Sequence, residues 1–179
     1  MSLLSYNELV KLVEAGVITN VRDGAINASS IDIHLAPKIL VEANRRKTVT
    51  YAKREPLGMY EIDLTAKGGF DIPPGGFLLA SSVEMFNLPA DISAQYRLKS
   101  SMARIGLEHL NAGHCDAGWH GSALTLELKN ITQFHTIRLT AGDPIGQMVF
   151  WRHEEVPAER SYAARGRYNR DESASGIKL

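Results

Sequence analysis

One carboxylate, Glu127, stands in the middle of the strand-like run SALTLELKN at residues 122–130. Leucines at every second position from 124 to 128 would share one face of a strand, which puts Thr125, Glu127 and Lys129 on the other face. An acidic residue opposite an apolar stripe is usually solvated surface. The same placement also suits a carboxylate that moves a proton in a reaction. The alternation by itself leaves both interpretations open.

A second segment, RLKSSMARIGL at residues 97–107, offers groups that bind phosphate. Lys99, Ser100, Ser101 and Arg104 place two cations and two hydroxyls within six residues. The cations would offset the charge of a polyphosphate, while the hydroxyls and nearby backbone N–H groups would donate hydrogen bonds to it. A surface turn that leads into a short helix has the same pattern, so the segment indicates a polyphosphate site without establishing one.

The glycine-rich run NAGHCDAGWHG follows at residues 111–121. Its glycines allow the backbone to approach a ligand closely around Asp116 and the ring of Trp119.

Histidine and cysteine side chains gather between residues 109 and 120 and raise the question of zinc. His109, His114, Cys115 and His120 have a spacing that matches no common zinc-ligand pattern, and adjacent side chains point to opposite sides of an extended chain. Zinc nucleoside deaminases require two thiolates from a P-C-x-x-C motif, whereas this chain has one cysteine. The sequence also lacks a phosphate-binding loop of the GxxxxGK[ST] type and a GxSxG nucleophile elbow. We therefore expect no zinc centre.

Composition limits the class of protein. The 179 residues fit one domain, and 44% hydrophobic and 22% charged residues are ordinary for a globular fold with a core. Twenty basic residues balance twenty acidic ones, so no overall field favours nucleic acid or a membrane surface. The single cysteine fits a reducing compartment, and the sequence shows neither a signal peptide nor an apolar run of membrane-spanning length. We expect a soluble, cytoplasmic protein without a nucleic-acid or membrane partner.

The elements that must position these residues are mainly strands. One amphipathic helix is predicted over residues 5–18, with Ser5 or Asn7 as its cap and Gly16 at its end. Short β-type segments follow, separated by Gly and Pro, at 29–36, 38–43, 60–64, 75–86, 123–130, 136–141 and 145–152. This pattern predicts a compact, all-β sandwich or barrel.

The chain from residue 156 onward is polar and poor in large apolar side chains. Such a segment either frays or becomes ordered over a ligand or a neighbouring subunit. Tyr162, Arg165, Arg167, Tyr168 and Arg170 would suit an anionic ligand that carries a ring.

Taken together, KSSMARIGL, NAGHCDAGWHG and TLELKN resemble the dCTP deaminase and dUTPase family. INASSIDIHL, GGFLLASSVEMFNLPADISAQ and GDPIGQMVF extend the similarity, in family order, through most of residues 26–152. The resemblance implies one domain over residues 1–179, built as a distorted, dUTPase-like β jelly roll with a short N-terminal helix. It also implies a homotrimer with shared active sites and a flexible tail, residues 156–179, that closes over the nucleotide.

The branch that the residues resemble most is the dCTP deaminase. Its members attack the 4-position of cytosine with water, use a glutamate on the strand after the glycine-rich motif to move the protons, and need no zinc. Glu127 in TLEL matches that glutamate. The resemblance implies zinc-independent conversion of dCTP to dUTP and ammonia, with Glu127 as general acid/base. Ser100 and Arg104 would position the water or polarise the pyrimidine.

The same resemblance implies a set of substrate contacts. The backbone at Ala112 would contact the base, Asp116 would hold the 3′-hydroxyl, and Trp119 would lie beside the sugar. Magnesium would be bound through the nucleotide phosphates. The remaining expected substrate-binding residues are Lys99, Ser101, Tyr162, Arg167 and Asn169.

Departures from the family pattern keep two alternatives. Gly113 stands where several plain deaminases have histidine, and in this the sequence is closer to bifunctional members that release dUMP and diphosphate. The first alternative is therefore a bifunctional enzyme or a plain dUTPase. Lys99 replaces a common arginine, which weakens the case for bidentate phosphate binding there. A non-catalytic nucleotide-binding relative is the other alternative, because the tail has GRYNRDESAS in place of a GKYQGQ-like pattern and because one extra residue precedes TLEL. A β-bulge would absorb it, whereas a slip in register would turn Glu127 to the other face.

Overall fold

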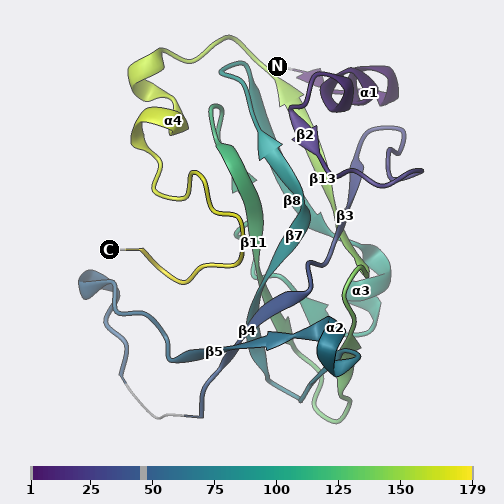
Figure 1. Cartoon of the computed structure of the whole chain (residues 1–179), viewed down its shortest axis with the longest axis vertical. Coiled ribbons are helices and arrows are strands. Elements are labelled where there is room, and N and C mark those ends of the chain that lie inside the picture. Colours follow the sequence, from purple (N-terminus) through teal and green to yellow (C-terminus); the bar gives the residue numbers. More distant parts are fainter. Residues whose placement is uncertain (1, 45–47, 179) are drawn as a thin grey trace.

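Two antiparallel sheets form the body of the protein (Figure 1). The computed structural model describes residues 2–44 and 48–178. The larger sheet has the order β5-β4-β7-β11-β9, with β2 also paired to β7. Its strands are β2 (Ile18–Thr19), β4 (Lys38–Glu42), β5 (Met59–Asp63), β7 (Phe77–Asn87), β9 (Leu107–Glu108) and β11 (His120–Asn130).

The smaller sheet has the order β1-β13-β8-β10, with β3 also paired to β13. Its strands are β1 (Ser2–Leu3), β3 (Ile31–His34), β8 (Ile92–Leu98), β10 (His114–Cys115) and β13 (Pro144–Arg152). A separate two-stranded ribbon joins β6 (Phe70–Ile72) to β12 (Ile137–Leu139). The mainly β fold that the punctuated short segments predict is confirmed.

A single apolar core joins the two sheets. Met148 and Phe150 of β13 are fully buried from one side, and Leu126 and Leu128 of β11 from the other. Alternation of buried and less buried residues along each strand follows from the period-2 geometry of a strand that covers a core with one face. The leucine stripe of β11 is therefore core, and its opposite face is free for chemistry.

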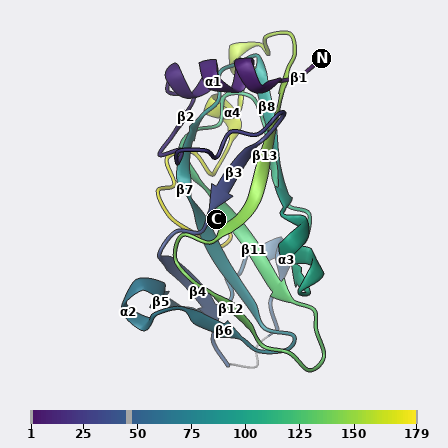
Figure 2. The same ribbon diagram turned by 90° about the vertical axis from the view of Figure 1, so that its right-hand side faces the viewer.

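Short helices lie around the sheets (Figure 2). The helices are α1 (Tyr6–Glu14), α2 (Leu64–Lys67), α3 (Ser100–Arg104) and α4 (Tyr162–Arg165), with single 3₁₀ turns at Tyr51–Lys53 and Ala158–Arg160. The predicted N-terminal helix is confirmed with Ser5 as its cap, where the backbone N–H of Ser5 donates to the Glu8 carboxylate at 2.9 Å. In the described part of the chain, no helix is long and apolar enough to cross a membrane.

Pairing between β7 and β11 is interrupted twice. The register shifts between His120 and Ser122, where Gly121 has a φ of +64°, and again between Ala123 and Thr125. Beyond the second shift the pairing is regular, with Glu127 opposite Leu79. Bulges of this kind absorb extra residues while they preserve the faces of the strand. Glu127 thus stays on the face opposite the core-facing leucines.

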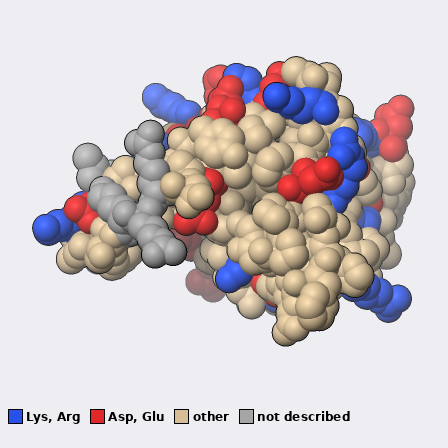
Figure 3. All heavy atoms as spheres, turned by 90° about the horizontal axis from the view of Figure 1, so that it is seen from below, with Lys and Arg blue, Asp and Glu red and all other residues tan. Residues whose placement is uncertain are grey.

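The two regions that carry polar motifs lie on different sides of the molecule. In Figure 1 the chain from α4 to the C-terminus runs beside β11, whereas α3 lies on the opposite side. Figure 3, a view from below, shows charged side chains of both signs scattered over that face among uncharged ones.

Candidate active site

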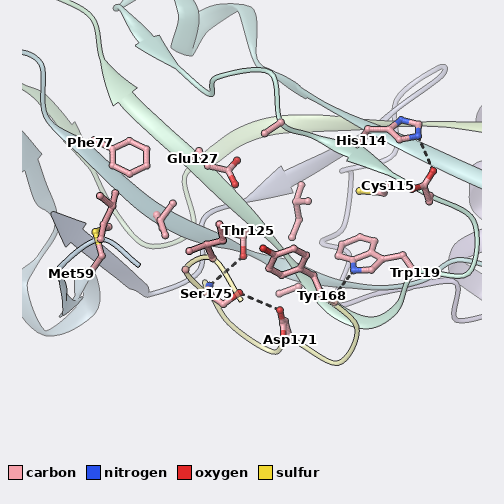
Figure 4. A pocket seen from close by; sticks show the side chains of 18 of the residues that line it. Met59, Phe77, His114, Cys115, Trp119, Thr125, Glu127, Tyr168, Asp171 and Ser175 are labelled. Atoms are coloured by element: carbon pink, nitrogen blue, oxygen red, sulfur yellow. Dashed lines mark hydrogen bonds and ion pairs between the residues drawn. The ribbon is translucent and has the colours of Figure 1, made fainter. Parts of the chain in front are cut away.

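A cavity of about 470 Å³ lies over the face of β11 that points away from the core (Figure 4). Residues of β7 and β11 form its floor, and the glycine-rich segment closes one end. Residues between 49 and 59 form the other end, and the tail covers one side with residues from 162 to 177. Four stretches of the sequence, within residues 49–59, 77–79, 112–127 and 162–177, thus enclose one space.

Glu127 lies in the middle of this cavity. Its side chain projects between Phe77 and Met59 on one side and Trp119 on the other (Figure 4). The residue is half-buried, and among the described residues no cation forms an ion pair with it. Burial raises the pKa of the Glu127 carboxyl, and a hydrogen bond from its own backbone N–H opposes this in part. Glu127 is thus a half-buried group inside a cavity and not an open surface carboxylate, and such a carboxyl can both accept and return a proton.

The glycine-rich segment supplies the second wall. Ala112, Asp116 and Trp119 all line the cavity. Asp116 is exposed to the space, and its carboxylate accepts a hydrogen bond from Nε2 of His114 at 3.2 Å, two positions earlier on the same side of the chain. The indole of Trp119 is held in place by the ring of Phe86, on which it stacks with ring centroids 5.2 Å apart. This wall therefore presents one carboxylate and one rigid aromatic edge to a ligand.

The tail is attached to the same wall by hydrogen bonds. Nε1 of Trp119 donates to the carbonyl of Tyr168 at 2.8 Å, and the backbone N–H of His120 donates to the Asn169 side-chain oxygen at 3.1 Å. Further along, the backbone N–H of Ala123 donates to the carbonyl of Asp171 at 2.7 Å. The side chains of Tyr162 and Tyr168 face the cavity from this segment.

The end of the chain turns back across the cavity. The backbone N–H of Ser175 donates to Oγ1 of Thr125 at 3.4 Å, beside Glu127. Lys178 forms an ion pair with Asp171, and its ammonium lies 5.5 Å from the centre of the Tyr168 ring. These contacts hold residues 171–178 over the site as a cover.

The phosphate-type residues on α3 lie elsewhere. Ser100, Ser101 and Arg104 are exposed, and none of them lines the cavity. Nζ of Lys99 is held by the Asp32 carboxylate at 2.7 Å, with both side chains largely buried. Arg167 is exposed and also outside the cavity wall. Within one chain, Glu127 therefore shares the cavity with the residues expected to contact the base and the sugar, which are Ala112, Asp116 and Trp119. The residues expected to contact the phosphates lie outside it.

Histidine, cysteine and acidic side chains do not form a metal centre in the described residues: no three of them gather closely enough to hold an ion. His114 is exposed and Cys115 buried, as expected for neighbours on an extended chain. Burial raises the pKa of the Cys115 thiol, which leaves it protonated and a poor metal ligand at neutral pH.

Several cavity residues were not predicted from the sequence. Phe77 and Leu79 reach the site because β7 pairs with β11, and Met59 reaches it from β5, which is joined to β7 through β4. Strand register of this kind is a long-range property that no local pattern encodes. Thr125 could have been found, because it shares the face of Glu127 by simple alternation.

The chain has clear relatives. Residues 3–153 match the family described as dCTP deaminase-like. Over 168 residues it is 34% identical to dCTP deaminase, dUMP-forming, of Mycobacterium ulcerans, which covers 92% of this chain and 87% of that protein. Over 166 residues it is 36% identical to the protein of the same name from Mycobacterium leprae, with 90% and 86% covered.

Solved structures confirm the fold. The 2′-deoxycytidine 5′-triphosphate deaminase of Agrobacterium tumefaciens superposes with a TM-score of 0.67 at 21% identity, covering 84% of this chain and 48% of that one. The dUTPase of Staphylococcus aureus phage phi11 gives a TM-score of 0.50 at 12% identity, covering 80% and 93%. The predicted dUTPase-like jelly roll is therefore correct, and the chain belongs to the dCTP deaminase-like family.

Proposed function

We propose that this protein deaminates dCTP hydrolytically and that Glu127 is its general acid/base. The observation that carries the proposal is the half-buried Glu127 carboxyl, whose pKa burial raises, in the centre of a nucleotide-sized cavity. In the reaction, water oxygen bonds to the 4-position of cytosine while Glu127 takes the water's proton and delivers it to ring nitrogen 3. A second proton transfer to the amino group then lets the carbon–nitrogen bond break, and ammonia leaves.

The nucleoside would lie along the wall formed by the glycine-rich segment. The Asp116 carboxylate can accept a hydrogen bond from the 3′-hydroxyl, and the fixed indole of Trp119 offers a surface for the sugar. The backbone at Ala112 borders the same space and would contact the base. These placements put the 4-position of the base toward Glu127.

The phosphate-side residues would come from a second copy of the chain. We propose a homotrimer in which Ser100, Ser101 and Arg104 of one subunit complete the cavity of its neighbour, because these exposed residues lie away from their own cavity. A cyclic assembly repeats such a contact at every interface. Lys99 would act mainly through its ion pair with Asp32, which fixes the start of α3.

The tail would contribute at the phosphate end. The side chain of Arg167 is exposed and free to reach a phosphate, whereas the Asn169 amide is bonded to the tail and to His120. The substrate would be the magnesium complex of the nucleotide, in which the ion is bound through the phosphates.

Two products are compatible with deamination of dCTP at this site. The sequence predicts conversion to dUTP, with release of dUMP and diphosphate as the alternative. The relatives at 34–36% identity carry the name dUMP-forming, which favours the alternative. The AGHCDAG segment, with Gly113 in place of histidine, supports the same choice.

The test is an incubation of purified protein with dCTP and magnesium, followed by chromatography and an ammonia assay. Glu127→Gln should lower ammonia release at least about 100-fold, the usual contribution of a general acid/base. Glu159→Gln, an exposed residue outside the cavity, is the matched control and should retain activity. dUMP without accumulated dUTP would establish the bifunctional reaction, and ammonia release unaffected by Glu127→Gln would contradict the mechanism.

A further inference from the structure

The cavity continues past Glu127 into an apolar end. Its apolar walls there are the side chains of Val49, Leu57, Met59, Phe77 and Leu79. Glu55 also lines this end, and its carboxylate accepts a hydrogen bond from the backbone N–H of Thr50 at 2.9 Å. Val49 and Leu57 line this end and are 38% and 40% exposed, so apolar surface there is left uncovered in the described chain. Apolar surface of this kind gains free energy when a ligand covers it.

Strand register places this apolar end next to the reacting group. Leu79 is the cross-strand partner of Glu127, so the two side chains project from the same face of the sheet. Phe77 lies two residues further along that face, and Met59 approaches from β5 (Figure 4). Trp119 lies on the other side of Glu127. The carboxylate therefore separates a sugar-binding end from an apolar end.

The geometry of a pyrimidine assigns an occupant to the apolar end. With the sugar at Trp119 and the 4-position at Glu127, the ring edge that carries positions 4 and 5 faces away from the sugar. Unsubstituted cytosine presents only hydrogen at position 5 and would leave this end unfilled. We propose that the apolar end selects cytosine deoxynucleotides that carry a small alkyl group at position 5, with the methyl group as the fitting size.

This inference rests on the proposed function and names its substrate class. Hydrolysis replaces the 4-amino group by oxygen from water and releases ammonia, and it leaves the 5-methyl group in place. The product from 5-methyl-dCTP is then a thymidine nucleotide, either the triphosphate or, with a second water and release of diphosphate, the monophosphate. No further reactant is needed.

The experiment is a competition in one tube between equal amounts of dCTP and 5-methyl-dCTP, with magnesium and wild-type protein. The ratio of thymidine to deoxyuridine products gives the ratio of kcat/KM values directly. We expect a preference for 5-methyl-dCTP of about tenfold, the lower end of what one methyl group contributes in a fitted apolar pocket. Equal rates, or a preference for dCTP, would overturn the inference and leave the deaminase function intact.

A pair of variants tests whether the apolar end is the cause. Met59→Gln keeps the length of the side chain, makes its end polar and should lower the preference severalfold. Met85→Gln is the matched control: it is the same substitution at an equally half-buried residue of β7 that does not line the cavity, and its preference should equal that of wild type. Thermal melting of both variants shows that they are folded.

Binding separates failure of this inference from failure of the proposed function. Calorimetry on Glu127→Gln should give a lower Kd for 5-methyl-dCTP than for dCTP even where no nucleotide is turned over. Absence of that difference overturns the inference whatever the activity. A preference for N4-methyl-dCTP over the 5-methyl compound would assign the apolar end to the leaving group and overturn the assignment to position 5.

Discussion

Replacement of Asn169 by alanine should release the tail from the site. The Asn169 amide donates to the carbonyl of Tyr162 at 2.8 Å and to that of Gly166 at 3.4 Å, while its oxygen accepts from the backbone N–H of His120 at 3.1 Å. The two shorter bonds contribute about 1 kcal/mol each, and the half-buried N–H of His120 loses its acceptor, so the total is about 2–3 kcal/mol. That change raises the open population of the tail about 30-fold or more.

Hydrogen exchange measures this opening directly. The amide of Ala123 donates to the Asp171 carbonyl and the amide of Arg170 to the His120 carbonyl, so both are protected only while the tail is docked. In Asn169→Ala their exchange should accelerate about 30-fold, while amides in β8, on the other sheet, keep their rates. Arg167→Ala, an exposed side chain in the same segment, is the control. Unchanged exchange at Ala123 in Asn169→Ala would refute the assignment of Asn169 as the anchor of the tail.

Three further substitutions test single features of the site. Burial raises the pKa of Glu127 above its value of about 4.5 in the unfolded chain, so the charged form destabilises the folded protein as the pH rises through the folded pKa, and this loss is absent below pH 4.5. Glu127→Gln should therefore raise Tm at pH 8 and leave it unchanged at pH 4 in calorimetric scans. Lys99→Met should lower the free energy of unfolding, measured in urea, by about 1–3 kcal/mol, because it leaves the Asp32 carboxylate largely buried without its cation. Adding Asp32→Asn to that variant removes the unpaired charge and should restore part of the stability. Gly118→Ala should destabilise the chain by about 1–3 kcal/mol in the same assay, because φ is +85° there and the new Cβ would lie 1.8 Å from Oγ of Ser161.

Local patterns in the sequence predict those parts of the fold that depend on neighbours along the chain. The face of Glu127 follows from alternation, and the cap of the first helix follows from Ser5 and Glu8 three residues apart. The strand β8 (Ile92–Leu98) was missed, although Ile92, Ala94 and Tyr96 are buried in strict alternation. The small side chain of Ala94 fits a well-packed interior, but it contributes little to the alternation of large apolar residues from which a strand is predicted.

What the sequence does not predict depends on pairing between distant segments. The apolar end of the cavity exists because β7 pairs with β11, which places Phe77 near Glu127, and because β4 pairs with both β7 and β5, which brings Met59 of β5 to the same cavity. The family resemblance supplies the roles of Asp116 and Trp119, and the fold then shows that both side chains border the same space. The family resemblance also assigns Arg104 to the active site, whereas in the fold of one chain Arg104 does not line the cavity that contains Glu127.

The separation of Arg104 from Glu127 can be tested by mixing subunits. Arg104→Ala and Glu127→Gln should each abolish most deamination when alone. In a cyclic trimer whose sites each take Glu127 from one subunit and Arg104 from the next, random mixing of the two variants pairs an intact Glu127 with an intact Arg104 at about one site in four. Unfolding and refolding the two proteins together should therefore recover about a quarter of wild-type activity, while refolding either alone recovers none. A site contained within one chain would always hold one of the two substitutions, so persistent inactivity of well-mixed, refolded subunits would show that Arg104 acts on its own chain's Glu127.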